Sequence, residues 1–510
     1  MNVGIAVTRS ARKAPDSIAA FDDDRELTYR ELDERTSRLA NAFHERYGLE
    51  RGDRVALLVH NRIAVLEVLA ACAKAGVTYC GLNFRLGLPE YEDIFANAEP
   101  RLLITEPEFA ATAAHLRERQ EMAMIDLDDL GPDGYEGVIA SSPAHEPKTL
   151  HEVRPEDDFA IVYTSGTTGQ PKGVYFDHSA AVLHAAIAAI EYEVTAQSRW
   201  MTALPHNSTV FVTSLPLLTM GGAMGFAETR GFDAERFAAN VRKHGATHTF
   251  LVPTMLFRVL DAGLDGEAMP TLKTIGYGSS PIPPERVKEL VRRFGPIFTQ
   301  VYGMAEVASI GTMLRKDDHL KAMDDERLFA SCGTASYAMD VRVVDESGAD
   351  VGPGERGEVI FGSPHTMKSY YRDPERTAAV LIDGWMHSGD IGEWDDDGYL
   401  YIVDRMKDMI IRGGHNILPS EIENVLYGHP AVLEAAVIGL PDDEWGESVA
   451  AGIALRDGTT ASAEELQELC RSAGLSSIKV PARIEFLDVL PKNAVGKIAK
   501  RSVKEQMLAS

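Results

Sequence analysis

Short apolar runs alternate with amphipathic helical segments through the first three hundred residues, and this alternation limits the folds open to the chain. Residues 54–59 form an apolar run of strand length, and a helix is predicted over residues 63–74, closed by Gly76. A capping box at Thr28 and Glu31 predicts another helix start. Further strand-like runs lie at residues 159–163, 249–252, 274–277 and 298–302. Units of this kind predict α/β sheets with helices on their faces.

From about residue 341 the pattern becomes richer in predicted strands. Strands are expected at residues 341–344, 357–361 and 398–402, with turn signals between them. The last hundred residues read as a small α+β unit that begins near residue 404. It contains predicted helices at 419–427 and 463–473 and a strand at 435–438. With 510 residues, the chain is too long for one core, because single cores stop growing near roughly 250–300 residues.

The composition excludes several classes of partner. A net charge of −26 argues against nucleic acids and anionic membranes, which both attract cationic surfaces. The four cysteines (Cys72, Cys80, Cys332 and Cys470) show no CxxC pairing, so neither a disulfide framework nor a zinc site is expected. Residues 1–9 lack the features of a signal peptide, and no apolar stretch approaches the roughly 20 residues of a membrane span. A cytoplasmic location is therefore expected.

A loop rich in glycine and hydroxyl groups follows the apolar run 159–163. Its backbone N–H groups and hydroxyls can converge on an anion, while Lys172 adds a cation. It is not a Walker A loop, because no Gly-Lys-Ser/Thr occurs at the required spacing. A plain surface loop is disfavoured, because such loops rarely place these residues directly after a buried strand. The predicted phosphate ligands are Thr164, Ser165, Gly166, Thr167, Thr168, Gly169 and Lys172.

This loop resembles the phosphate-binding signature of the adenylate-forming superfamily, which includes acyl-CoA synthetases, peptide-synthetase adenylation domains and firefly luciferases. The resemblance covers roughly residues 10–505 and recurs in further motifs in the family order. It implies a large N-terminal domain, residues 1–404, of helix-flanked β-sheets plus a distorted β-barrel. It also implies a small mobile α+β C-terminal domain, residues 405–510. ATP, Mg²⁺ and coenzyme A are the implied cofactors, and a small carboxylic acid is the implied substrate.

Two motifs resemble the family's adenine-binding segments. By this resemblance Tyr302 packs on adenine beside Gly303, and the Glu306 carboxylate holds Mg²⁺, a hard ion that prefers oxygen ligands. Ala305 departs from the family's usual threonine, and the loss of one neutral hydrogen bond costs ~0.5–1.5 kcal/mol. The second motif is a Gly-rich turn that packs against adenine and forms the floor of the acyl pocket; its residues are Gly278, Ser279 and Ser280.

The motifs nearer the C-terminus imply a ribose site and a hinge. Asp390 is expected to accept both ribose hydroxyls, since a carboxylate accepts two hydrogen bonds and donates none. By the family pattern Arg405 contacts ribose or phosphate, and Lys407 is the pivot between the domains. Gly413 and Gly414 allow a loop to approach the pantetheine arm closely. The family generally has glycine where this chain has Asp404.

Residues 491–498 resemble the motif that carries the family's catalytic lysine. During adenylation, negative charge gathers on oxygens around the α-phosphorus, and an ammonium brought to them offsets that charge. Lys497, after Gly496, is the expected catalytic residue, together with Glu306 and Lys407.

The acid itself is less constrained by the sequence. The pocket is expected to draw on residues around 206–208, 210–211, 277–278 and 303–304, a mixture that favours an aryl or short-to-medium acid over a long fatty chain. For His206, a purely structural role as a buried histidine is equally open. The named pocket candidates are His206, Asn207, Tyr277, Met304 and Ala305.

The predicted function is ATP-dependent activation of a carboxylic acid as acyl-AMP, followed by transfer to coenzyme A. A first alternative passes the acyl group to a carrier-protein thiol, an amine or another nucleophile. A second is a nucleotide-binding protein without activity, which only the departures at Ala305 and Asp404 favour. The oligomeric state is left open, with a homodimer as the candidate.

Overall fold

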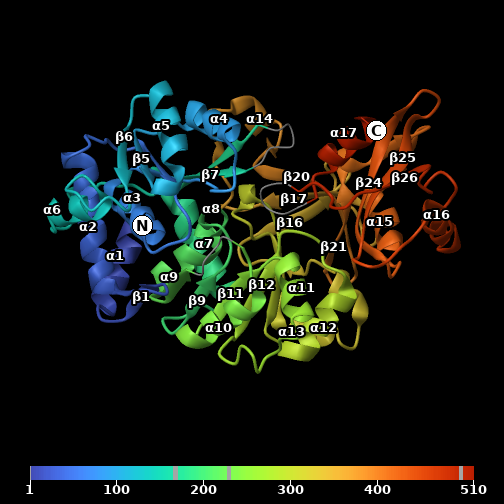
Figure 1. Ribbon diagram of the computed structural model, residues 1–510, viewed down its shortest axis with the longest axis horizontal. Helices are drawn as coiled ribbons and strands as arrows, with labels where there is room; N and C mark the ends of the chain where they lie inside the picture. Colours follow the sequence, from blue (N-terminus) through green and yellow to red (C-terminus); the bar gives the residue numbers. More distant parts are fainter. Residues whose placement is uncertain (1, 165–169, 227–230, 493–497, 510) are drawn as a thin grey trace. The chain divides into compact units, whose positions relative to one another are not determined.

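The computed structural model describes residues 2–164, 170–226, 231–492 and 498–509 (Figure 1). The chain divides into two compact units, each treated by itself. The first comprises residues 1–341 and 361–386, and the second comprises residues 342–360 and 387–510.

The first unit contains a nine-stranded sheet. Its order is β15-β14-β13-β12-β11-β9-β10-β1-β2, and the six central strands from β13 to β1 run parallel. The carboxyl ends of parallel strands share one edge of a sheet, where ligand sites are commonly built. The strands are β1 (Ile18–Phe21), β2 (Glu26–Thr28), β9 (Arg199–Thr202), β10 (Ala223–Phe226), β11 (His248–Leu251), β12 (Thr274–Gly278), β13 (Phe298–Tyr302), β14 (Thr312–Leu314) and β15 (Thr334–Ala335).

A seven-stranded sheet lies in the same unit. Its order is β18-β8-β7-β4-β3-β5-β6, parallel from β7 to β6 and antiparallel where β7 meets β8 and β8 meets β18. The strands are β3 (Arg54–Leu58), β4 (Thr78–Gly81), β5 (Leu102–Thr105), β6 (Ala123–Asp126), β7 (Asp158–Thr164), β8 (Lys172–Asp177) and β18 (Ser369–Tyr370).

Helices connect these strands and begin where the sequence provides caps. The predicted capping box is present, with Thr28 capping α2 and Glu31 pairing back to it. All twelve residues of α3 are buried, and Gly76 closes this helix at φ +71°. The helices are α1 (Val3–Lys13), α2 (Tyr29–Glu45), α3 (Ala64–Ala75), α4 (Leu88–Ala98), α5 (Ala110–Arg119), α6 (Tyr135–Ser141), α7 (His178–Glu191), α8 (His206–Thr209), α9 (Leu215–Met220), α10 (Ala234–His244), α11 (Pro253–Asp261), α12 (Pro284–Phe294), α13 (Lys316–Lys321) and α14 (Pro374–Ala378).

Two smaller sheets complete the chain. A five-stranded sheet, in the region predicted to be rich in strands, has the order β16-β17-β20-β19 with β21 beside β20. The C-terminal sheet has the order β23-β22-β25-β24 with β26 beside β25, and it packs with α15 (Pro419–Tyr427), α16 (Ala463–Ser472) and α17 (Lys500–Ala509). The strands are β16 (Asp340–Val344), β17 (Gly357–Gly362), β19 (Leu381–Ile382), β20 (Trp385–Trp394), β21 (Leu400–Arg405), β22 (Ile410–Arg412), β23 (His415–Ile417), β24 (Val432–Asp442), β25 (Gly446–Leu455) and β26 (Arg483–Phe486).

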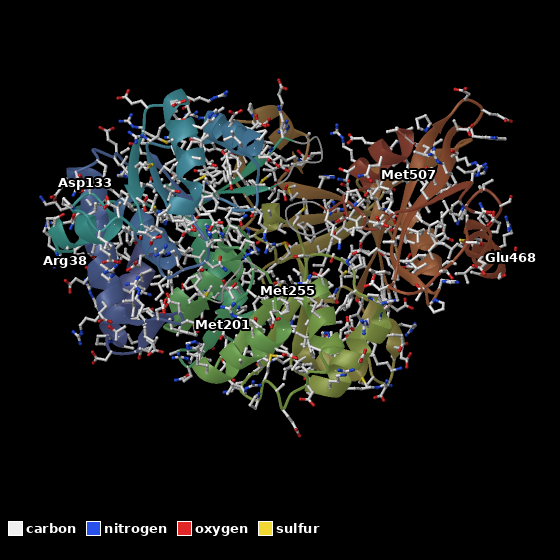
Figure 2. All side chains as sticks on the ribbon, viewed as in Figure 1. Arg38, Asp133, Met201, Met255, Glu468 and Met507 are labelled. Carbon is white, nitrogen blue, oxygen red and sulfur yellow. The ribbon has the colours of Figure 1, made fainter. Side chains whose placement is uncertain are left out.

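This architecture confirms the predicted α/β fold class. Large helix-flanked sheets precede a small α+β C-terminal part, in the order the sequence indicated. Charged side chains such as Asp133 and Glu468 extend into solvent, while Met201 and Met507 are buried in the cores of their units (Figure 2). Within the described ranges, no helix has both the length and the apolar character needed to cross a bilayer.

Buried neutral histidines make this fold sensitive to acid. Burial lowers the pKa of each of five histidines to about 4: His178, His206, His248, His319 and His365. In an unfolded chain a histidine titrates near ~6.5, so below that pH the unfolded state binds protons that the native state refuses. The contribution of these histidines to the free energy of unfolding is therefore fully present above pH ~6.5. It declines as the pH falls toward 4.

We expect each such histidine to lower the free energy of unfolding by about 1.4 kcal/mol per pH unit below ~6.5. Calorimetric Tm values between pH 7.5 and 5 measure this decline, in a range where ordinary carboxyl groups stay ionised. The variant His248→Gln should show a shallower slope, because it removes one of the five. A Tm that is constant across this range would contradict the expectation.

Candidate active site

The predicted phosphate loop joins two paired strands of the seven-stranded sheet. β7 ends at Thr164 and β8 begins at Lys172, and these two residues are direct antiparallel partners. Both side chains are half-buried. The two ends of the loop are thus fixed side by side, with Lys172 at its base. The remaining predicted ligands, Ser165, Gly166, Thr167, Thr168 and Gly169, lie outside the described residues.

Tyr370 links the predicted phosphate lysine to the predicted metal carboxylate. Its hydroxyl donates a hydrogen bond to Glu306 Oε1 at 2.6 Å, and Lys172 Nζ lies 4.9 Å from the centre of its ring. Burial, followed by the Glu306 charge, raises the pKa of the Tyr370 hydroxyl, so this group remains a neutral donor. Sequence analysis missed Tyr370. No local motif marks it, because it reaches this position through the pairing of β18 with β8.

The surroundings of Glu306 fit a divalent cation. The side chain belongs to a residue that is only 6% exposed, and the Met367 N–H donates to the Glu306 carbonyl at 2.7 Å, which fixes the backbone. Among the residues that the structure describes, no cationic side chain pairs with this carboxylate. A buried carboxylate without a cation is costly. Glu306 is therefore suited to hold Mg²⁺ through oxygen.

The two predicted adenine segments leave neighbouring parallel strands at the same edge. Gly278 ends β12 and Tyr302 ends β13, and in the pairing of these strands Gly278 lies opposite Val301. A Cβ at Gly278 would stand 2.3 Å from the Val301 carbonyl oxygen, so only glycine fits this position. Gly303 is equally constrained, since its Cβ would lie 2.7 Å from the Ser309 carbonyl oxygen.

The other residues of the two adenine segments keep part of their surface exposed to solvent. The Tyr302 ring lies 5.9 Å from the Phe361 ring, centre to centre, and is half-buried. Ser279 adopts φ +73° in the turn after β12, followed by Ser280. Met304 and Ala305 are half-buried before and within the short helix η4 (Ala305–Val307).

The predicted acyl-pocket residues separate into two groups. Tyr277 is fully buried and donates toward His319 Nε2 at 2.8 Å, so its side chain contributes to the core. His206 is also committed, with Nδ1 3.2 Å from the Tyr79 hydroxyl and Nε2 3.2 Å from the Val59 carbonyl. This favours the structural role for His206. Asn207 differs, because its buried Oδ1 has no hydrogen-bond partner among the described residues.

The predicted ribose residues meet in the second unit. Asp390 and Arg405 are opposite each other on β20 and β21, and Arg405 Nε lies 3.0 Å from Asp390 Oδ1. The Asp390 N–H donates to Ser388 Oγ at 3.0 Å, and this hydroxyl donates to the Val359 carbonyl at 2.5 Å. Ser388 therefore connects Asp390 to the neighbouring strand β17.

Asp404 has a defined structural role. Its carboxylate accepts the N–H of Ser420 at 2.9 Å and that of Arg405 at 2.7 Å. The Ser420 hydroxyl in turn donates to the Val403 carbonyl at 2.5 Å. These contacts join the end of β21 to the first turn of α15, across the segment that contains Lys407.

The predicted hinge and the predicted glycine loop both lie in the chain between β21 and α15. Lys407 belongs to the short helix η6 (Met406–Asp408). Gly413 and Gly414 form the two-residue turn between β22 and β23, with φ of +56° and +80°. Two successive positive φ values are typical of the hairpin turns that favour glycine. Lys497, the expected catalytic lysine, lies outside the described residues.

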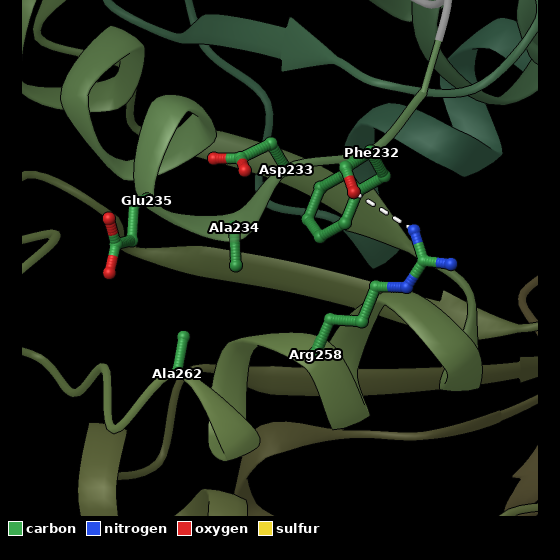
Figure 3. Close-up of a pocket in the computed structure, with 6 residues that line it drawn as sticks. All are labelled: Phe232, Asp233, Ala234, Glu235, Arg258 and Ala262. Atoms are coloured by element: carbon green, nitrogen blue, oxygen red, sulfur yellow. Dashed lines mark hydrogen bonds between the residues drawn. The ribbon is translucent and has the colours of Figure 1, made fainter.

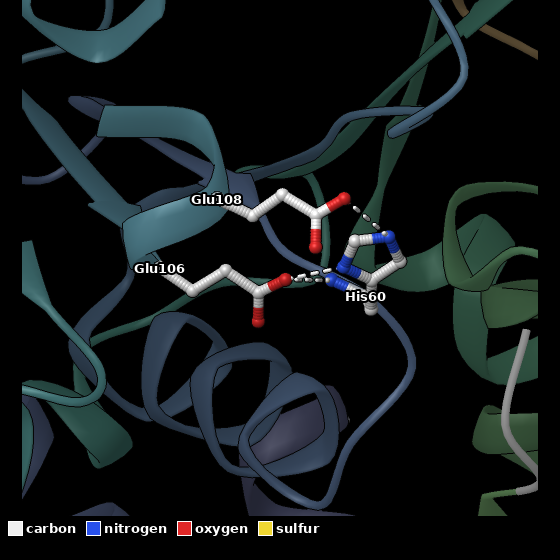
Figure 4. Close-up of side chains that lie close together, drawn as sticks. All are labelled: His60, Glu106 and Glu108. Atoms are coloured by element: carbon white, nitrogen blue, oxygen red, sulfur yellow. Dashed lines mark hydrogen bonds and ion pairs between the residues drawn. The ribbon is translucent and has the colours of Figure 1, made fainter. Parts of the chain in front are cut away.

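Two further features do not belong to this site. A shallow, open surface pocket of about 330 Å³ is lined by six residues outside every predicted motif (Figure 3). His60 lies between Glu106 and Glu108, with ligand atoms close enough for a metal ion (Figure 4). However, Glu106 already pairs with His60 and with Arg62 Nη1, the latter at 3.2 Å, so this carboxylate has partners without a metal.

Comparison with known proteins identifies the class of enzyme that has this sequence pattern and fold. The model of the AMP-binding enzyme family matches residues 7–371, and that of the AMP-binding enzyme C-terminal domain matches residues 421–497. A feruloyl-CoA synthase from Amycolatopsis is 37% identical, over 98% of this chain and 97% of its own. Among solved structures, ATP-bound MatB from Rhodopseudomonas palustris is similar with a TM-score of 0.88, 29% identity and 99% coverage of both chains. The amide bond synthetase McbA from Marinactinospora thermotolerans gives 0.87, also at 29% identity and 99% coverage of both.

The fold and these matches define an adenylate-forming ligase. The chain belongs to the AMP-binding enzyme family. The predicted membership in the adenylate-forming superfamily, among the acyl-CoA synthetases, is confirmed. So is the predicted class of enzyme, an AMP-forming acid–thiol ligase.

Proposed function

We propose that this ligase uses Mg·ATP to activate an aryl or short-to-medium carboxylic acid as acyl-AMP, and then transfers the acyl group to coenzyme A. The observation that carries the proposal is the cluster of Lys172, Tyr370 and Glu306 at the base of the glycine-rich loop. It combines a cation for phosphate with a buried carboxylate for a metal. The relative that makes feruloyl-CoA supports both the acyl-CoA product and the aryl substrate.

In the first step, different residues of the first unit bind the phosphates, the adenine and the metal ion. Lys172 and the loop that begins at Thr164 bind the phosphates, and Tyr302 packs on adenine. Glu306 holds Mg²⁺, which when bound neutralises charge on the phosphate oxygens. Tyr370 keeps the Glu306 carboxylate in place. The acid's carboxylate then attacks the α-phosphorus in line, and pyrophosphate leaves.

The second unit contributes the remaining groups. Asp390 accepts the ribose hydroxyls, and Arg405 supports the ribose or a phosphate. Lys497 offsets the charge that develops between the carboxylate and the α-phosphate. The residues after 404 rotate about Lys407 for the second step, which withdraws Lys497 and presents the turn at Gly413 and Gly414. The coenzyme A thiolate then attacks the acyl carbon and AMP leaves.

A second acceptor has a specific observation in its favour. The structural neighbour McbA is described as an amide bond synthetase, so an amine acceptor is the alternative to coenzyme A. We expect AMP release from a preferred acid to accelerate at least tenfold when coenzyme A is added, because thiol attack removes the tightly held acyl-AMP. An HPLC assay of AMP with and without coenzyme A, and with an amine panel, measures this. Acceleration by amines alone would support the amide alternative.

The acid is identified by a screen of thioester formation. We expect benzoates, cinnamates and acids of short to medium chain to react with higher kcat/KM than long-chain fatty acids. A clear preference for the longest chains would contradict the proposed substrate class. The cytoplasmic location and a homodimer remain predictions.

A further inference from the structure

A second cationic side chain lies at the end of the glycine-rich loop. Arg376 belongs to α14 (Pro374–Ala378) and to no predicted motif. Its Nη2 donates a hydrogen bond to Oε1 of Gln170 at 3.0 Å. Gln170 is two residues before Lys172, the predicted phosphate cation. An arginine is therefore in contact with the segment that is proposed to bind the phosphates of ATP.

The pairing of two strands brings α14 to this place. Tyr370 of β18 lies opposite Val174 of β8. The N–H of the next residue, Tyr371, donates to the Gly173 carbonyl at 2.7 Å. Because these strands are antiparallel, the chain after β18 continues toward Lys172, the first residue of β8. The register of the sheet thus places the residues after β18 beside the phosphate loop, which no local sequence signal predicts.

Hydrogen bonds tie α14 to the strand that carries Tyr370. The Tyr370 N–H donates to Thr377 Oγ1 at 2.9 Å, and this hydroxyl donates to the Asp373 carbonyl at 2.6 Å. The Asp373 carboxylate caps the helix, since its Oδ1 accepts the N–H of Arg376 at 3.0 Å. The backbone of Arg376 is therefore held in a fixed position relative to Tyr370.

The guanidinium of Arg376 is oriented by two partners. Its Nε lies 3.4 Å from Asp373 Oδ2, and its Nη2 contacts Gln170. The side chain is half-buried. A guanidinium presents five N–H donors in one plane, so donors remain beyond those that face these two residues. Such a planar group matches the oxygens of a phosphate and binds them through charge-assisted hydrogen bonds.

The charge of Arg376 also reaches Tyr370. Burial, and then the Glu306 charge, raise the pKa of the Tyr370 hydroxyl, while the Arg376 charge opposes them. Lys172 Nζ lies 4.9 Å from the centre of the same ring. Two cationic side chains are therefore close to one tyrosine. In a chain with a net charge of −26, an anion such as ATP needs local cations of this kind.

The contacts run in one direction from the predicted adenine segment. Tyr302 is four residues before Glu306, and Tyr370 links Glu306 to Lys172. Arg376 comes last in this series. The same order, from adenine to the metal to the end of the chain of phosphates, describes Mg·ATP. We propose that the Arg376 guanidinium binds the terminal phosphates of ATP, those that leave as pyrophosphate. This inference rests on the proposed activation of an acid by Mg·ATP.

The test measures binding of the nucleotide and of the leaving group. We expect Arg376→Gln to lower kcat/KM for ATP in acyl-AMP formation by roughly 10- to 100-fold, because a charge-assisted hydrogen bond is lost. The inhibition constant of added inorganic pyrophosphate should rise by a similar factor. Thioester formation from supplied acyl-AMP should stay within a fewfold of wild type, because acyl-AMP has no terminal phosphates. HPLC assays of AMP and of the thioester measure these constants.

Arg372→Gln is the matched control for the change in charge. Arg372 is exposed, lies four residues before Arg376 and pairs with Glu99. Its replacement removes the same charge near the same helix, and we expect it to leave the constants for ATP and pyrophosphate unchanged.

Two further variants separate binding from positioning. Arg376→Lys should recover part of the loss, because it restores the charge. Gln170→Ala should have a much smaller effect than Arg376→Gln, because it leaves the guanidinium in place. If Gln170→Ala reproduces the full loss, Arg376 acts only by positioning Gln170, and the inference is wrong.

The remaining outcomes separate this inference from the proposed function. If Arg376→Gln keeps the wild-type constants for ATP and pyrophosphate, the inference fails and the proposed function stands. If it slows both half-reactions equally, the side chain is structural and the inference also fails. If the wild type forms no AMP from ATP with any carboxylic acid, the proposed function fails, and the inference with it.

Discussion

Replacing Lys497 with alanine is expected to slow acyl-AMP formation by ~10²–10³-fold, the loss usual for one group that stabilises developing charge. Thioester formation from supplied acyl-AMP should change only fewfold, because the proposed rotation removes Lys497 before the thiol attacks. Pyrophosphate exchange measures the first half-reaction, and conversion of synthetic acyl-AMP measures the second.

Lys492 provides the matched control for this experiment. It belongs to the same motif but pairs with Glu434, with Nζ 2.6 Å from Oε1. Lys492→Ala should leave both half-reactions within a fewfold of wild type. An equal loss of both half-reactions in Lys497→Ala would refute the division of labour between the two steps.

Glu306→Gln is expected to reduce acyl-AMP formation by at least ~100-fold, since it removes the charge of the proposed metal ligand while keeping its shape. The amide oxygen can still accept the Tyr370 hydrogen bond, so the surrounding structure should persist. The Mg²⁺ concentration for half-maximal activity should rise together with the loss of rate.

The variant Tyr370→Phe tests how much the positioning of the Glu306 carboxylate matters, because it leaves the charge of that group unchanged. It retains the carboxylate and loses only the 2.6 Å hydrogen bond, so we expect a loss of about tenfold or less. Circular dichroism spectra and Tm values of both variants check that they fold, and we expect both to match the wild type. An unchanged Mg²⁺ dependence in Glu306→Gln would remove Glu306 from the metal site.

Most helices and strands could be predicted from the sequence, because the signals for them act between residues that are close together in the chain. The capping box at Thr28 and the closing glycine Gly76 each satisfy backbone groups within one turn, and both stand where predicted. The predicted strand at residues 435–438 is instead the middle of β24 (Val432–Asp442), which pairs along its length with β25. The outer residues of β24 adopt a strand conformation because of this pairing. A run of apolar residues does not predict such pairing.

Within the candidate site, sequence patterns indicated candidate residues but not the partners that some of them have in the structure. Asp390 and Arg405 were predicted separately, and the register of β20 and β21 makes them an ion pair. Tyr370 carries no motif, and its hydroxyl contacts a residue more than sixty positions away. Such contacts depend on tertiary packing, which a single sequence does not display.

The tie between Asp404 and Ser420 bears on any swivelling of the C-terminal part. Lys407 lies between these two residues in the chain, so a turn there that carries α15 away from β21 must first part the Ser420 N–H from the Asp404 carboxylate. Under the proposed rotation about Lys407, Asp404 therefore stabilises the conformation that keeps α15 beside β21. We expect this side chain to influence the relative rates of the two half-reactions without contacting either substrate.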